Sequence, residues 1–194
     1  MSCSPGAVAI TPSRTRDERR ERFEMLAMPH LDAAYNLACW LSRSKTDADD
    51  IVQESMLRAF QAFNSLRGAD AKPWLLAIVR NCARTHGSRR AKRAFDDLGP
   101  DHESLESATS EAPADPEIAT IQSDHGRRLR TAIAALPVEF RETLILREME
   151  DLSYREIATI TQVPIGTVMS RLARARTLLK QQWFESVQGG RHAV

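Results

Sequence analysis

The sequence predicts an all-α fold of two small helical domains joined by a flexible acidic linker, with a helix-turn-helix in the second domain. Apolar residues recur at three- and four-residue steps in both halves of the chain, and no segment shows the alternation typical of a strand. Between the halves, residues 94–126 hold nine Asp or Glu and no Lys or Arg. The 194 residues are enough for one or two small domains, each with its own core.

The first domain is predicted at residues 22–93, behind a disordered leader at residues 1–21. Its first apolar stripe is interrupted by Pro29, where we expect a kink or a new helix start. A second helix is predicted to run to about Phe63. Residues 64–73 contain Gly, Asn, Asp and Pro, which predicts a loop before a third helix.

The second domain is predicted to follow a flexible linker at residues 94–116. Acids, Ser and Pro dominate this linker, so it cannot bury enough apolar surface to offset the entropy cost of ordering. Helical patterning then resumes, and we place a compact four-helix domain at residues 117–184. Residues 185–194 are expected to form a frayed tail.

A helix-turn-helix is predicted between Leu152 and Lys180. Ser153 and Glu156 have the spacing of a capping box, in which each side chain binds a free amide at the start of a helix. Pro164 breaks this helix and is tolerated at the start of the next, which carries arginines and no carboxylate. This layout is typical of a second helix that enters a DNA major groove. The alternative is two packed helices with a solvated basic face.

Charge and chemistry narrow the function further. The net charge of +1 hides a strong segregation, because residues 80–93 hold six Arg or Lys and no acid. The three cysteines show neither CxxC spacing nor a nearby His, and we find no nucleophile–base pair or phosphate loop. We therefore expect no catalytic residue, no metal and no cofactor, and a protein that is not an enzyme. No apolar run reaches the roughly 18 residues that span a bilayer, and the N-terminus lacks a signal peptide's apolar core, so we expect a cytoplasmic location.

Two segments of the first domain resemble a known family. DADDIVQESMLRAFQAF (47–63) and SLRGADAKPWLLAIVRNCAR (65–84) are similar to the extracytoplasmic-function (ECF) group of bacterial sigma factors, and GTVMSRLARAR in the helix-turn-helix resembles that family's −35 reader. ECF sigma factors are small RNA polymerase subunits with only regions two and four of the larger sigma proteins. The resemblance covers about residues 22–184. It implies binding to core RNA polymerase and promoter DNA, an anti-sigma factor that is often membrane-linked, and no small-molecule substrate.

The resemblance also implies three functional surfaces. The docking surface is expected to contact core polymerase, although its acids also compensate a helix dipole, and it consists of Asp47, Asp49, Asp50, Gln53 and Glu54. The −10 surface is expected to capture and contact bases of the melted promoter element, and it consists of Asn64, Ser65, Leu66, Arg67, Gly68, Arg80, Asn81 and Arg84. The −35 surface lies on the second helix of the helix-turn-helix, and it consists of Thr167, Met169, Ser170, Arg171, Arg174 and Arg176.

One residue departs from the family pattern. Met169 stands where the family usually has Lys or Arg, so the −35 sequence need not follow the common preference of the group. Two other functions stay open at this point. A stand-alone helix-turn-helix regulator would bind an operator without polymerase, although it has no need for the segments at 47–63 and 65–84. An interaction module whose main role is sequestration is the third hypothesis.

Overall fold

The structure, a computed structural model, describes residues 12–42, 44–66, 70–98 and 124–189. Every regular element in these ranges is a helix, as the sequence predicts. The first domain contains α1 (Pro12–Ala27), the 3-10 turn η1 (Met28–His30), α2 (Leu31–Leu41), α3 (Lys45–Ala62), the 3-10 turn η2 (Phe63–Ser65) and α4 (Ala71–Leu98). The second domain contains α5 (Asp124–Ala134), α6 (Val138–Glu148), α7 (Tyr154–Thr161) and α8 (Ile165–Gly189).

The core of the first domain lies where α2, α3 and α4 pack against one another. Leu37, Ile51 and Leu75, one from each helix, are fully or almost fully buried there. Pro29 sits in η1 and separates α1 from α2, which confirms the break predicted at that proline. Phe23 on α1 packs edge-on against Phe60 and Phe63, with ring centroids 5.3 and 5.4 Å apart. The N-terminal helix is therefore tied to the end of α3.

The core of the second domain forms because α5, α6 and α7 all pack on α8. Ile145 on α6, Ile157 on α7 and Leu172 on α8 meet in this core with at most 1% exposure. Val168 is also fully buried and lies one turn before Leu172, so a single stripe of α8 faces inward. The opposite face of α8 is left toward solvent.

Three predicted boundaries are wrong where the structure describes them. Residues 12–21 of the expected leader belong to α1, residues 94–98 of the expected linker extend α4, and residues 185–189 of the expected tail extend α8. The first error has a clear cause, since long-range contacts to α3 hold a helix whose polar composition gives no sign of them. The rest of the predicted leader, linker and tail, and residues 117–123, lie outside the described residues.

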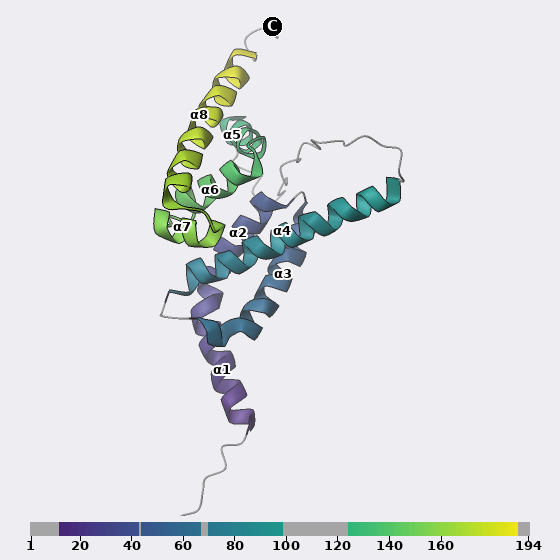
Figure 1. Cartoon of the computed structure of the whole chain (residues 1–194), viewed down its shortest axis with the longest axis vertical. Coiled ribbons are helices and arrows are strands. Elements are labelled where there is room, and N and C mark those ends of the chain that lie inside the picture. Colours follow the sequence, from purple (N-terminus) through teal and green to yellow (C-terminus); the bar gives the residue numbers. More distant parts are fainter. Residues whose placement is uncertain (1–11, 43, 67–69, 99–123, 190–194) are drawn as a thin grey trace, which may run out of the picture.

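The two domains lie against each other (Figure 1). Helix α6 packs on α2, and α7 packs on α4, so the second domain covers part of the surface that α2 and α4 present.

None of the helices in the described ranges combines the length and apolar character needed to cross a bilayer.

Candidate nucleic-acid interface

The helix-turn-helix consists of α7 and α8, and its first helix begins with the predicted capping box. Ser153 Oγ accepts a hydrogen bond from the Glu156 amide at 3.3 Å, and Glu156 Oε2 accepts one from the Ser153 amide at 2.7 Å. Hydrogen bonds from the Ser153 hydroxyl and amide hold the pKa of Glu156 below its usual range, because they favour the charged carboxylate. Two otherwise free amides are thus satisfied at the start of α7.

The turn between the two helices is short and well defined. Gln162 adopts a left-handed conformation with φ 57° and ψ 40°, and the Val163 amide donates to the Ala158 carbonyl at 3.2 Å. Pro164 follows at the start of α8, where its carbonyl accepts hydrogen bonds from the amides of Thr167 and Val168. Pro164 therefore starts the second helix, as predicted.

The −35 surface lies on the outward side of α8. Met169 is 53% exposed, and Ser170 and Arg174 are also exposed, whereas Thr167 and Arg171 are half-buried. Arg171 and Arg174 have no ion pair with any carboxylate of the described residues. This surface carries the donors and positive charge that a major-groove reader uses.

Arg176 differs from the other two arginines of the −35 surface. It donates to Glu148 of α6 at 2.6 Å, and this hydrogen bond raises the pKa of Arg176 above its usual value. The side chain is still about half exposed. Arg176 thus joins α8 to α6 and is a weaker candidate for a base contact.

The −10 surface is divided between η2 and α4. Asn64 and Ser65 lie exposed in η2, and Leu66 follows them half-buried. On α4, Asn81 and Arg84 are exposed. The remaining loop residues of this surface, Arg67 and Gly68, lie outside the described residues.

Arg80 is buried, and a residue that contacts DNA has to be accessible. Its side chain is only 4% exposed and pairs with Glu142 of α6, with Nε–Oε2 and Nη2–Oε1 distances of 2.9 and 3.1 Å. The fork of Arg80 therefore binds both carboxylate oxygens across the domain interface. Its neighbours offered a signal, because Leu76, Val79 and Ala83 place Arg80 on the apolar face of α4. In this arrangement Arg80 cannot reach a DNA strand.

Two residues of the docking surface, Asp47 and Glu54, make ion pairs within the first domain. Asp47 accepts from Arg90 at 2.6 Å and lies 3.2 Å from His86, so it joins the start of α3 to α4. Glu54 pairs with Arg58 one turn along α3. The other three members of the surface, Asp49, Asp50 and Gln53, are exposed. These three keep the solvent-facing character that a partner contact needs.

A second polar contact joins the domains at Glu150, which is itself buried. Asn36 Nδ2 donates to Glu150 Oε1 at 2.6 Å, and Lys72 Nζ lies 3.0 Å from Oε2 and donates to the Glu150 carbonyl. No local pattern singles out Glu142 or Glu150, since their partners are distant in the chain. A buried carboxylate of this kind is stable only when a cation and hydrogen-bond donors contact it.

A cavity of about 470 Å³ opens beside the buried ion pair, between the two domains. Arg84 of the −10 surface and Arg171 of the −35 surface both line it, together with Glu139 and Glu142. Two residues that are predicted to read different promoter elements thus face one cleft. Among the described residues, no group of His, Cys, Asp or Glu has the arrangement of a metal site.

Comparisons with known proteins agree with this two-domain architecture. Sigma-70 region 2 matches residues 26–93, and sigma-70 region 4 matches residues 126–179. The chain is 31% identical over 179 residues to the ECF RNA polymerase sigma factor SigE of Mycolicibacterium smegmatis, and the match covers 92% of this chain and 68% of that protein. It is 32% identical over 161 residues to the RNA polymerase sigma-H factor of Pseudomonas aeruginosa, and this match covers 81% of this chain and 83% of that protein.

A solved structure shares the fold. The sigma factor RpoE of Bartonella quintana, in a complex with the anti-sigma factor NepR, superposes with a TM-score of 0.69 at 27% identity, over 84% of this chain and 97% of that one. The matches to both regions and to these relatives agree with the motifs of α3, α4 and α8. The chain belongs to the ECF group of RNA polymerase sigma factors, and its two helical domains are regions 2 and 4 of that family.

Proposed function

We propose that this sigma factor binds core RNA polymerase and directs it to promoters by reading two separate DNA elements. The observation that carries the proposal is that one chain holds two polar surfaces of different design. One is a basic helix face on α8, and the other combines a short loop with the exposed side of α4. A stand-alone operator-binding protein needs only the first of these surfaces.

The −35 surface is proposed to read duplex DNA through the major groove. Arg171 and Arg174 are the residues proposed to contact base edges, since they have no carboxylate partner in the described part of the chain. A bidentate arginine–guanine contact provides about 1–3 kcal/mol of discrimination. Met169 adds an exposed apolar group to this face, which suits contact with a thymine methyl better than with a phosphate.

The −10 surface is proposed to act on the melted strand. Asn64 to Gly68 would hold an unpaired base, and Asn81 and Arg84 would contact its neighbours. Arg80 is proposed to join them only after the second domain has moved away and released Glu142. Reading both elements at once therefore requires the closed arrangement to open.

The docking surface is proposed to contact core polymerase through Asp49, Asp50 and Gln53, because these side chains are exposed on the first turns of α3. Acidic residues at this position favour a steered encounter with a basic partner. By likeness to the Bartonella quintana complex, we also propose an anti-sigma factor as a regulator. The protein is proposed to act in the cytoplasm and to perform no chemistry of its own.

The test is transcription in vitro from the protein's own promoter with purified components. Transcripts are expected only when the chain and core polymerase are both present. If the chain alone bound a duplex site tightly and specifically, and gave no transcript with core polymerase, the stand-alone regulator would be the better account.

A further inference from the structure

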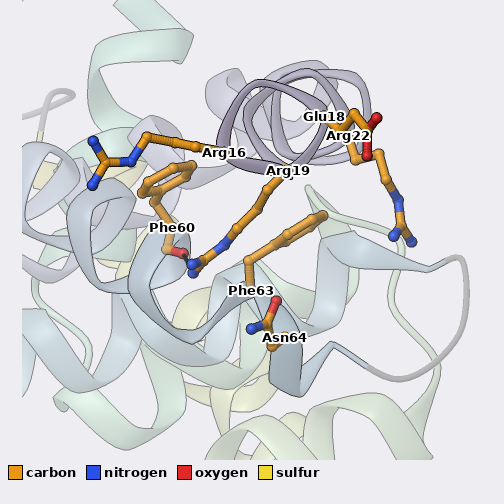
Figure 2. Close-up of a pocket in the computed structure, with 7 residues that line it drawn as sticks. All are labelled: Arg16, Glu18, Arg19, Arg22, Phe60, Phe63 and Asn64. Atoms are coloured by element: carbon orange, nitrogen blue, oxygen red, sulfur yellow. Dashed lines mark hydrogen bonds between the residues drawn. The ribbon is translucent and has the colours of Figure 1, made fainter. Parts of the chain in front are cut away.

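A second cavity lies far from the domain interface, between α1 and the end of α3. It has a volume of about 510 Å³, a size common for ligand sites. Figure 2 shows Arg19 reaching between Phe60 and Phe63, with Asn64 of the −10 surface at the other end. Arg16, Glu18 and Arg22 complete the lining, so three arginines face one carboxylate.

Arg19 builds the wall of this cavity. Its Nη2 donates to the carbonyls of Phe60 and Gln61, at 2.6 and 3.1 Å. These are among the last carbonyls of α3, and the Phe60 carbonyl also accepts a hydrogen bond from the Phe63 amide at the C-cap. The guanidinium carbon lies 5.0 Å from the centre of the Phe60 ring. The cavity is thus a built feature of the first domain, because its central cation is fixed by three contacts.

Arg16 and Arg22 supply the charge that is still available. Both are exposed, and within the described residues neither has an ion pair or a hydrogen bond to the chain. Arg20, on the same helix, behaves differently: it pairs with Glu24 at 2.8 Å and does not line the cavity. Among the side chains of α1 that the structure describes, the unpaired cations are therefore those beside the aromatic wall.

Cations beside aromatic groups are the chemistry with which proteins hold unpaired nucleic acid strands, since the cations bind phosphates and the rings contact bases. Asn64 lies in this cavity and also begins the loop of the −10 surface. A strand that contacts Asn64 would therefore lie next to the cavity. We propose that the cavity is a second strand-binding site, which takes the nucleotide of the melted strand that neighbours the one held at Asn64.

This inference rests on the proposed promoter-melting function and adds α1 to it. The experiment compares Arg16→Ala and Arg22→Ala with Arg20→Ala, which removes the same charge from the same helix outside the cavity. Each variant is bound to core polymerase, and its affinity is measured for a promoter probe whose −10 strand is unpaired. The probe is used at several salt concentrations, beside a probe that ends before the unpaired nucleotides.

Arg16→Ala and Arg22→Ala are each expected to weaken binding to the unpaired probe and to reduce the salt slope by about 0.7 per lost phosphate contact. The ratio of wild-type to variant affinity should therefore fall roughly 2.6-fold between 50 and 200 mM salt. Arg20→Ala should match the wild type. On the shortened probe all four proteins should bind equally, and assembly with core polymerase should be unchanged.

Other outcomes overturn the inference in separate ways. Equal behaviour of all three variants on the unpaired probe would show that the cavity does not bind the strand. Loss of assembly with core polymerase in Arg16→Ala or Arg22→Ala would assign the cavity to the polymerase. If Arg16→Ala and Arg22→Ala weakened binding of a polyglutamate peptide but left the affinity for the unpaired probe unchanged, the cavity would be assigned to an acidic protein partner. Failure of the wild-type holoenzyme to bind the unpaired probe would instead contradict the proposed function itself.

Discussion

The −35 surface and the −10 surface of this sigma factor differ in how the fold presents them. On α8, Met169 and Arg174 are exposed, and the arginines that are proposed to read bases have no carboxylate partner in the described chain. On α4, Asn81 is exposed, whereas Arg80 is buried against Glu142 of the other domain. The closed arrangement thus leaves Met169 and Arg174 of the −35 surface accessible, places Arg171 in the cleft between the domains and buries Arg80 of the −10 surface.

The difference follows from how each surface is built. The helix-turn-helix depends on contacts within a few residues, namely the capping box at Ser153 and the turn at Gln162. The −10 surface depends on α4, which packs on α2 and α3 of its own domain and also on α7 of the second domain. Met169 and Arg174 therefore keep their surroundings when the domains move, whereas Arg171 and the residues of α4 beside the interface do not.

The largest effect is expected from Glu142→Ala. The variant leaves the Arg80 guanidinium buried and unpaired, and breaking such a pair costs about 3–5 kcal/mol if the group stays buried. Because the domains can separate and hydrate Arg80, we expect the chain to open, with a larger radius of gyration by small-angle X-ray scattering and unchanged helix content.

Two further variants control for the loss of Glu142. Glu148→Ala removes a carboxylate from the same helix, but its partner Arg176 is in the same domain, so it should leave the radius of gyration unchanged. The double variant Arg80→Met/Glu142→Leu replaces the buried pair by apolar groups and should stay closed. An unchanged radius in Glu142→Ala would contradict the view that this pair holds the domains together.

The next effect concerns the two DNA readers. Arg171→Ala or Arg174→Ala should lower discrimination at the −35 element by about 1–3 kcal/mol, measured as holoenzyme binding to probes with single −35 substitutions. Asn81→Ala should instead weaken binding to −10 variants. Both changes should leave assembly with core polymerase intact. Loss of assembly in any of these variants would show that the surfaces are misassigned.

Ser153→Ala tests the local stability of the helix-turn-helix. Loss of the N-cap is expected to cost about 1 kcal/mol of unfolding free energy, measured by urea denaturation, while Thr159→Ala on the same helix serves as a control. The pKa of Glu156 is depressed in the folded state, so its contribution is present above the usual glutamate range and is lost as the pH falls through the depressed value. The difference between wild type and Ser153→Ala should therefore shrink in acid. A difference that grew in acid would contradict the capping role.

Lys72→Ala should give the smallest effect on closure. Its ion pair with Glu150 is 27% exposed on the lysine side and 5% on the glutamate side, and Asn36 still donates to the buried carboxylate when Lys72 is removed. We therefore expect a rise in the radius of gyration that is smaller than that of Glu142→Ala. An opening as large as that of Glu142→Ala would show that Glu150 is the main contact between the domains.

The sequence predicted what depends on local pattern. The all-α class, the break at Pro29 and the capping box of Ser153 and Glu156 follow from spacing and residue type alone, and the structure confirms them. The helix at residues 12–21 was missed, because the contact that holds Arg19 joins residues 41 positions apart.

The sequence predicts that Arg80 contacts DNA, because the residue that actually pairs with it is also distant in the chain. Its partner Glu142 lies 62 positions away, and neither periodicity nor spacing connects them. Burial was nevertheless readable in part, since Leu76 and Val79 mark the face of α4 on which Arg80 lies. An arginine on the apolar face of a helix can therefore be explained by a buried ion pair as well as by a ligand contact.

We expect the free chain to be closed and promoter reading to require that its two domains separate. The most direct test is the distance between spin labels at Arg89→Cys on α4 and Thr177→Cys on α8, in a background without the native cysteines. Both positions are exposed and lie on different domains. One defined distance is expected for the free chain, and a longer one for the chain bound to core polymerase and promoter DNA. The same distance in both states would contradict the account.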